Sequence, residues 1–255
     1  MLLPFRTSVH PRRTPYVTYA LIAVNIVIFL LEFGVNPQTG QLGYRAWVYD
    51  LMLRAQVSPW WNYLSYAFLH ADFWHILFNM FFLYLFGRVV NDRLGTLGFL
   101  AFYLAGAAAS GLGQTALHPN PQIPVLGASG AVAAVTGAYL VLFPQSLLTI
   151  IYWFFFIGTI EVPALYFILL KMILLDNVLA RGQGSIAYDA HLAGYAYGVV
   201  ITFLLLITHL VGGSNFDLWS MIQRWNRRRR YRDSVAEGHD PFSYAGARRR
   251  VEAKE

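Results

Sequence analysis

One serine in this chain stands in a run of very small residues. Ser129 lies in the stretch Val-Leu-Gly-Ala-Ser-Gly-Ala-Val, where Gly127 and Gly130 flank it. Small residues of this kind let two helices pack closely in an apolar environment. A serine hydroxyl becomes a useful nucleophile when a general base lies within about 3 Å. The stretch alone does not distinguish close packing from catalysis.

Other polar residues that suit acyl transfer stand in separate apolar stretches. His191 is followed by Gly194 and Gly198, so a helix places the three on one face. Glycines on such a face let a neighbouring backbone come very close. His75 and Asn79 are four residues apart, which also places them on one helical face. Unpaired polar side chains are costly in hydrocarbon, so all of these residues are candidates for a functional site.

Together these groups meet the needs of serine-dependent acyl transfer. We predict that Ser129 is the nucleophile and His191 the general base, without a buried carboxylate. The developing oxyanion would be bound by the backbone N–H of Ser129 at a helix N-terminus and by the side chains of His75 and Asn79. His70 lies about 140° from His75 on a continuous helix, so we expect it to point elsewhere.

The elements that position these residues have the composition of membrane helices. The chain has 255 residues, of which 57% are hydrophobic and 13% charged, whereas a soluble domain has about a quarter charged residues. Cysteine is absent from the sequence, which excludes disulfides and thiol catalysis. The sequence predicts an all-α polytopic membrane protein. Its six apolar blocks cover, approximately, residues 16–33, 66–90, 97–117, 129–144, 163–179 and 190–210.

The fourth block is too short to cross a bilayer. About fifteen residues of helix, from Ser129 to Phe143, extend for roughly 22 Å, and the hydrocarbon core is about 30 Å thick. The first turn should therefore lie below the outer surface. The proline-rich approach, residues 118–124, must then descend into a water-filled cavity. We expect Ser129 to begin a buried helix whose first turn is wet.

The basic residues predict the orientation in the membrane. With six spans, 15 of the 19 Lys and Arg residues lie on the side of both termini, which the positive-inside rule makes cytoplasmic. A seventh span would move the basic tail outside, so residues 147–160 are interpreted as a loop in the inner interface. We expect a cytoplasmic tail over residues 1–14, a membrane domain over 15–211 and a basic cytoplasmic tail over 212–255. The tail would anchor the topology at the lipid bilayer, and nucleic acid is the weaker explanation of its charge.

In combination the motifs resemble those of the rhomboid family of intramembrane serine proteases. The family's second-helix histidines and asparagine, its Gly-x-Ser-Gly motif and its last-helix Ala-His-x-x-Gly-x-x-x-Gly motif occur here in the same order. The matching residues are His70, His75 and Asn79, then Gly127, Ser129 and Gly130, then Ala190, His191, Gly194 and Gly198.

The resemblance implies both a fold and an activity. The fold is a six-helix membrane bundle with a short fourth helix that carries the serine. The activity is cleavage by a dyad of Ser129 and His191, with oxyanion binding by His75 and Asn79 and a supporting role for His70. The implied substrates are single-span transmembrane proteins, cut near the outer end of their helix. The implied location is a bacterial-type plasma (inner) membrane, and no metal or other cofactor is implied.

Several positions depart from the family pattern. Arg45 precedes Trp47 by two positions where the family often has adjacent Trp and Arg in the first outer loop. Asn91 replaces a common acidic residue, and Ala133 replaces a tyrosine that stacks on the catalytic histidine in some members. Lys171 stands where an aromatic residue is common. These departures concern loop packing and substrate gating and leave the predicted catalytic set intact.

Three other functions remain as alternatives. A non-proteolytic rhomboid-like protein would bind membrane partners without cutting them, but such relatives usually lose the serine or the histidine. A small-solute transporter is disfavoured by the span count and by the lack of an inverted repeat. A metal site formed by His70, His75 and His191 would lack both carboxylate ligands and the His-Glu-x-x-His spacing.

Overall fold

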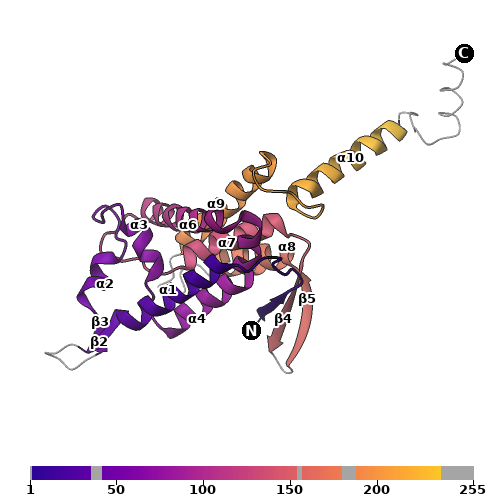
Figure 1. Cartoon of the computed structure of the whole chain (residues 1–255). Helices are drawn as coiled ribbons and strands as arrows, with labels where there is room; N and C mark the ends of the chain where they lie inside the picture. The colour runs from indigo at the N-terminus through magenta and orange to yellow at the C-terminus, as the bar shows by residue number, and fades with distance from the viewer. Residues whose placement is uncertain (1, 36–41, 154–156, 180–187, 237–255) are drawn as a thin grey trace, which may run out of the picture.

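Helices form most of the structure, a computed structural model that describes residues 2–35, 42–153, 157–179 and 188–236 (Figure 1). Within these residues, three helical stretches are long and apolar enough to cross a membrane, namely Phe73–Leu94, Thr96–Leu117 and Tyr188–Ile207. Shorter apolar helices cover Tyr16–Glu32, Ser129–Leu142 and Ala164–Leu174.

Each apolar block predicted from the sequence contains a helix. Four blocks correspond to the single helices α1 (Tyr16–Glu32), α6 (Thr96–Leu117), α7 (Ser129–Leu142) and α9 (Tyr188–Ile207). The second block consists of α4 (Phe73–Phe82), the π-helical segment η2 (Leu83–Gly87) and α5 (Arg88–Leu94). The fifth consists of α8 (Ala164–Tyr166) and the π-helical segment η3 (Phe167–Leu179).

The helix of the second block begins later than predicted. A short 3₁₀ turn, η1 (Tyr66–Phe68), is followed by non-helical residues 69–72 before α4 starts. The Asp72 carboxylate accepts a hydrogen bond from the backbone N–H of His75 at 2.9 Å, and this N-cap defines the start of the helix. His70 therefore does not share a helix with His75. The prediction that places them about 140° apart on one helix is wrong.

The connection between α1 and α4 folds over the end of the bundle where Ser129 lies. It contains the strand pair β2 (Phe33–Val35) and β3 (Leu42–Tyr44) and the short helices α2 (Ala46–Leu51) and α3 (Asn62–Ser65). Its Leu53 exchanges two backbone hydrogen bonds with Val125, at 3.0 and 2.7 Å. This bridge holds the connection against the segment that leads into α7.

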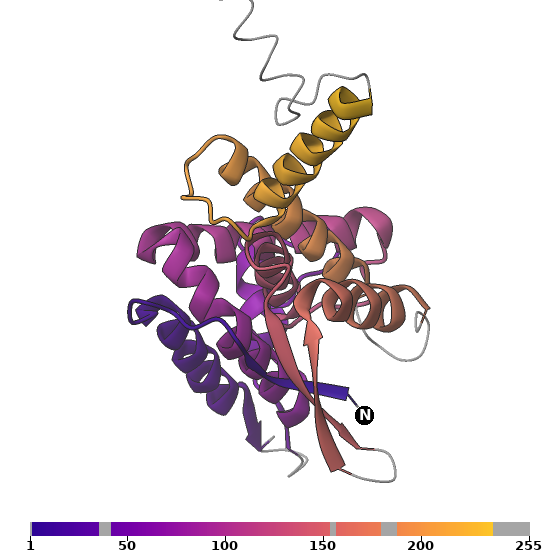
Figure 2. The ribbon, with the colours of Figure 1, turned by 90° about the vertical axis from the view of Figure 1, so that its right-hand side faces the viewer.

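The stretch predicted as a loop in the inner interface, residues 147–160, contains two β-strands over its described residues. The strands β4 (Leu147–Trp153) and β5 (Ile157–Pro163) pair antiparallel, and β1 (Leu2–Thr7) pairs with the other edge of β4 (Figure 2). Strand β4 contains several β-branched and aromatic residues, which favour strand structure. Residues 154–156 lie outside the described part of the chain.

The described parts of both terminal regions lie away from the β2–β3 pair (Figure 1). The backbone N–H groups of residues 12 and 13 donate to the Asp92 carboxylate at 3.1 and 3.0 Å. The next side chain, that of Arg93, donates to the carbonyl oxygen of Gly212. The end of α5 thus binds the N-terminal segment and the segment between α9 and the last helix.

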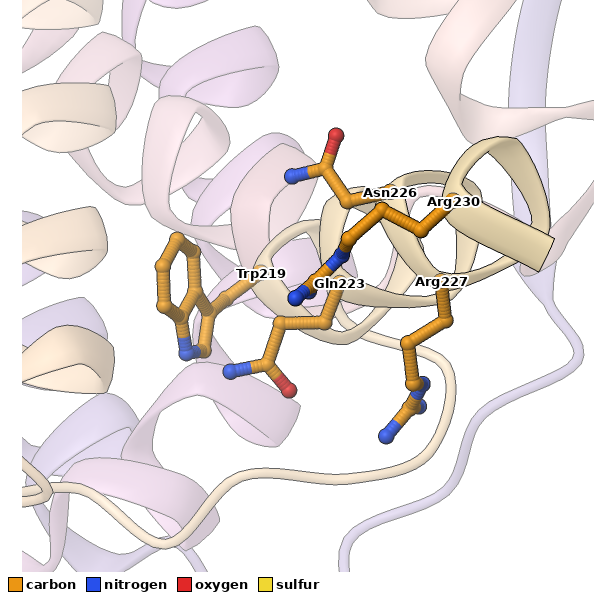
Figure 3. Close-up of a pocket in the computed structure, with 5 residues that line it drawn as sticks. All are labelled: Trp219, Gln223, Asn226, Arg227 and Arg230. Carbon is orange, nitrogen blue, oxygen red and sulfur yellow. The ribbon is translucent and has the colours of Figure 1, made fainter. Parts of the chain in front are cut away.

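The last helix, α10 (Leu218–Ala236), projects away from the bundle (Figure 1). Its base is attached through Trp219, whose ring packs edge-on against Phe203 of α9 with centroids 5.8 Å apart. Figure 3 shows that the polar and basic side chains of Gln223, Asn226, Arg227 and Arg230 follow Trp219 along the helix. Residues 237–255 of the predicted basic tail lie outside the described residues.

Candidate active site

Helices α7 and α9 pack with their backbones in contact, as the glycine pattern predicts. A Cβ atom added to Gly194 would overlap the carbonyl oxygen of Gly130, and one added to Gly198 would overlap the carbonyl oxygen of Ala134. Because both contacts advance by four residues on each helix, α7 and α9 run in the same direction at this interface. Residues near the two N-termini therefore lie at the same end of the pair.

Ser129 is the first residue of α7, and its position is fixed from the preceding segment. The backbone N–H of Gly127 donates to the carbonyl oxygen of Tyr66 at 2.9 Å. The Tyr66 hydroxyl in turn donates to the carbonyl oxygen of Ala107 at 2.8 Å. The first N–H groups of a helix have no intrahelical acceptor and carry a partial positive charge. The hydroxyl of Ser129 thus stands beside backbone donors that suit a negatively charged oxygen.

His191 lies in the first turn of α9, at the same end of the helix pair as Ser129. Each of the two residues is within one turn of the contact between Gly130 and Gly194. Both side chains are partly accessible, in a region where most neighbouring residues of α7 are buried. The tertiary structure therefore brings the predicted nucleophile and the predicted base to one accessible end of α7 and α9.

Gly127 places the His75 ring next to the serine. A Cβ atom at this glycine would lie 2.8 Å from Nε2 of His75 and 3.6 Å from Oγ of Ser129, so both atoms border the same small volume. The φ angle of Gly127 is +130°, which side-chain-bearing residues rarely adopt. Glycine at this position is required both by the backbone and by the ring of His75.

Asn79 lies one turn after His75 on α4 and is 6% exposed. Its Nδ2 atom has no hydrogen-bond partner among the residues that the structure describes. Buried amide groups are nearly always hydrogen-bonded, so an unpaired donor calls for an explanation. A donor reserved for an oxygen of a bound substrate is such an explanation.

The ring of His70 packs against the ring of His75, with centroids 5.2 Å apart and an edge-to-face orientation. Its backbone N–H donates to both carboxylate oxygens of Glu32, at 3.1 Å each. Burial, and then the neighbouring His75, lower the pKa of His70 from the usual 6.5 to about 3, so the ring is neutral at physiological pH. Glu32 is not among the site residues predicted from the sequence, although it is the sole acidic residue of the first apolar block.

Two residues of the connection between α1 and α4 support this histidine segment. The Tyr44 hydroxyl donates to the carbonyl oxygens of residues 70–71 at 3.4 and 3.1 Å. Burial, and next the Glu32 carboxylate, raise the pKa of Tyr44 to about 12, so the hydroxyl keeps its proton. Arg45 donates to the carbonyl oxygens of Glu32 and Phe33 at 2.8 and 3.2 Å. The connection is thus tied to the end of α1 although it lacks the adjacent Trp-Arg pair.

The other departures from the family pattern have different outcomes. The side-chain oxygen of Asn91 accepts hydrogen bonds from the backbone N–H and the hydroxyl of Thr18 at 3.3 and 3.2 Å. Its side-chain nitrogen donates to the carbonyl oxygen of Gly95 at 3.4 Å. The Asn91 side chain therefore joins α1 to the turn after α5, at the position where the family commonly has an acidic residue. Ala133 is buried in α7 and faces α9. The side chain of Lys171 lies outside the described residues.

Comparisons with known proteins point to one family. The family model described as Rhomboid domain matches residues 57–208. The chain is 28% identical over 195 residues to Rhomboid protein 1, mitochondrial, of Saccharomyces cerevisiae, covering 75% of this chain and 53% of that protein. It is 29% identical over 195 residues to the putative rhomboid protease YdcA of Bacillus subtilis, covering 76% of this chain and 89% of that protein.

The rhomboid protease GlpG of Klebsiella pneumoniae is 30% identical over 134 residues, which are 52% of this chain and 46% of that protein. The chain thus spans about half the length of the yeast and Klebsiella relatives and most of the length of the Bacillus relative. The matched region contains every predicted site residue, from His70 to Gly198. The chain has several apolar helices and is an integral membrane protein, and it belongs to the rhomboid family.

Proposed function

We propose that this chain is an intramembrane serine endopeptidase that cleaves transmembrane segments through a dyad of Ser129 and His191. The observation that carries the proposal is the contact between Gly130 and Gly194, which aligns the N-termini of α7 and α9. Gly130, Gly194 and Gly198 serve this alignment, and Gly127 makes room for the ring of His75. The relatives YdcA and GlpG, whose names describe them as rhomboid proteases, support the same activity.

The reaction would proceed in two halves. His191 takes the proton of the Ser129 hydroxyl as Oγ attacks the scissile carbonyl carbon, and the carbonyl oxygen becomes an oxyanion. The Ser129 N–H, the His75 ring and the Asn79 amide donate hydrogen bonds to that oxyanion. His191 then gives its proton to the leaving amine, and an acyl-enzyme remains. Water attacks this ester with His191 again as base, which releases the second product and restores Ser129.

The substrate class follows from the depth and shape of the site. Helix α7 has 14 residues and thus extends for about 21 Å, less than the hydrocarbon thickness. If its far end lies at the inner surface, Ser129 lies below the outer one. A helical substrate has its amides bonded internally, so the scissile segment must first unwind. Single-span membrane proteins cut near the outer end of their helix fit this site.

The same arrangement supports a six-helix bundle with α7 as the short serine-bearing helix. The N-terminal segment and the segment after α9 bind to the end of α5, where Arg93 also lies over the ring of Phe143 at the C-terminal end of α7. The excess of Lys and Arg in the N-terminal segment, in α5 and in α10 supports a cytoplasmic location for both termini, in a bacterial-type plasma membrane.

A serine-directed electrophile tests the proposal most directly. We expect a fluorophosphonate to label the full-length protein in detergent micelles, and mass spectrometry to locate the adduct on Ser129. Phosphonylation elsewhere in the folded protein, or none at all, would contradict a catalytic serine. Failure to label combined with capture of a membrane partner would instead favour the non-proteolytic alternative.

The oxyanion assignment makes a second prediction. Replacing either His75 or Asn79 with alanine should lower kcat by roughly ten- to a thousandfold while KM changes little, because the lost donors act only in the transition state. Cleavage kinetics on a model transmembrane substrate measure both constants. The exposed residues His10 and Asn226 provide matched control variants, His10→Ala and Asn226→Ala. An unchanged kcat in His75→Ala and Asn79→Ala would leave both residues with a structural role only.

A further inference from the structure

Polar side chains join the C-terminal end of α6 to the first turn of α9. His118 follows the last residue of α6, and its Nδ1 atom forms an ion pair with the Asp189 carboxylate. One turn earlier in α6, Gln114 accepts a hydrogen bond from the backbone N–H of Ala190, with 3.0 Å between that nitrogen and its Oε1. The two contacts reach the residues that immediately precede His191.

The two side chains of the ion pair stand at helix ends whose dipoles favour this arrangement. The Asp189 side chain is 4% exposed and stands in the first turn of α9, where the helix dipole favours a negative charge. The His118 side chain is 59% exposed and stands at the C-terminal end of α6, where the dipole favours a positive charge. The backbone N–H of His118 also donates to the carbonyl oxygen of Gln114 at 2.8 Å. The side chains of His118 and Gln114 therefore start from one capped helix end.

A close backbone approach reinforces the junction on the other side of the histidine. A Cβ atom added to Gly113 would overlap the Cβ atom of Ala193 and would lie 3.9 Å from the carbonyl oxygen of Asp189. Helix α6 therefore contacts α9 both before and after His191. This contact is separate from the contact of α7 with Gly194 and Gly198.

We propose that Asp189, together with His118 and Gln114, is a positioning clamp that holds the first turn of α9 so that His191 stays aligned with Ser129. The inference rests on the proposed function and adds residues outside the family motifs to it. The first turn of a helix has unpaired N–H groups and is prone to fray. Gln114 satisfies one of these groups, and Asp189 ties the same turn to α6. None of the three clamp residues needs to touch the reacting atoms.

The clamp predicts a loss of rate without a loss of substrate affinity. In Asp189→Asn, we expect the rate of Ser129 phosphonylation by a fluorophosphonate and kcat for a model substrate to fall about tenfold, because misplacement of the base by a fraction of an ångström suffices. KM should stay within about twofold, and the thermal unfolding midpoint in micelles should shift little. His118→Ala should reduce both rates less, since its side chain is more than half exposed.

Charge rescue and a double variant separate the clamp from general packing. His118→Lys places a permanent positive charge near Asp189 and should recover most of the rate lost in His118→Ala. The double variant of Asp189→Asn and His118→Ala should react no more slowly than Asp189→Asn alone, because both changes remove the same contact. His10→Ala is the control for a histidine outside the junction.

The outcomes distinguish this inference from the proposed function. If the wild type is labelled at Ser129 but Asp189→Asn is labelled equally fast, the clamp is wrong and the dyad stands. A loss of rate that only parallels unfolding would also overturn the clamp. If the wild type is not labelled, the dyad is wrong, and hydrogen exchange decides on the clamp. The rate of amide hydrogen exchange in the peptide with residues 188–194 should rise in Asp189→Asn and Gln114→Ala. Equal exchange rates in the wild type and in both variants would refute the clamp.

Discussion

Replacement of Ser129 by alanine is expected to abolish cleavage of a transmembrane substrate and covalent labelling together. The hydroxyl is the only group in the proposed mechanism that forms a covalent bond to the substrate. Loss of a nucleophilic serine costs about a millionfold in kcat in serine proteases, and loss of the base costs about as much. His191→Ala should therefore be almost as inactive as Ser129→Ala. The double variant should be no worse than either single variant, because the two residues act as a unit.

Purified full-length variants in detergent micelles allow this comparison, with product formation followed by mass spectrometry. Ser234→Ala in α10, outside the bundle, is a matched control for loss of a serine hydroxyl. Substrate cleavage by Ser129→Ala at more than a small fraction of the wild-type rate would exclude the serine as nucleophile. Full activity of His191→Ala with Ser129→Ala inactive would mean that another group is the base.

Substitution of Gly198 by alanine is expected to separate α7 from α9. The added Cβ atom would overlap the carbonyl oxygen of Ala134, which belongs to a helix backbone and cannot rotate away. Overpacking of this kind typically destabilises a protein by about 1–3 kcal/mol, occasionally more. This contact lies one turn beyond the contact between Gly130 and Gly194, on which the proposed alignment of Ser129 with His191 depends. Cleavage should therefore fall by about a hundredfold, even where the protein still folds.

Gly212→Ala is the matched control, since a Cβ atom there would have no neighbour within 4 Å. The thermal unfolding midpoint in micelles and kcat for the model substrate should both fall in Gly198→Ala, and both should be unchanged in Gly212→Ala. Equal behaviour of the two variants would show that the contact between α7 and α9 is not needed for stability or for the site.

The amino-acid sequence by itself determines most of the helices and the spacing of the candidate site residues. The apolar blocks predict where α1, α6, α7 and α9 lie. In hydrocarbon the backbone polar groups of a single segment can all be hydrogen-bonded only if that segment is a helix. The pattern of Gly194 and Gly198 after His191 predicts a close helix contact, because only glycine removes the side chain that keeps two backbones apart. These are local properties, which a single segment carries without its partners.

Only the tertiary structure decides which distant segments meet. The rings of His70 and His75 meet edge to face because Asp72 caps α4 between the two residues. Helical spacing alone predicts that the two rings point apart. Strand β4 pairs with β5 and also with β1, which lies about 140 residues earlier in the chain. The roles of Glu32 and of Asp189 with His118 depend on contacts between segments tens of residues apart. A local pattern cannot predict such contacts, because the partner of a buried polar group is chosen by the packing of the whole bundle.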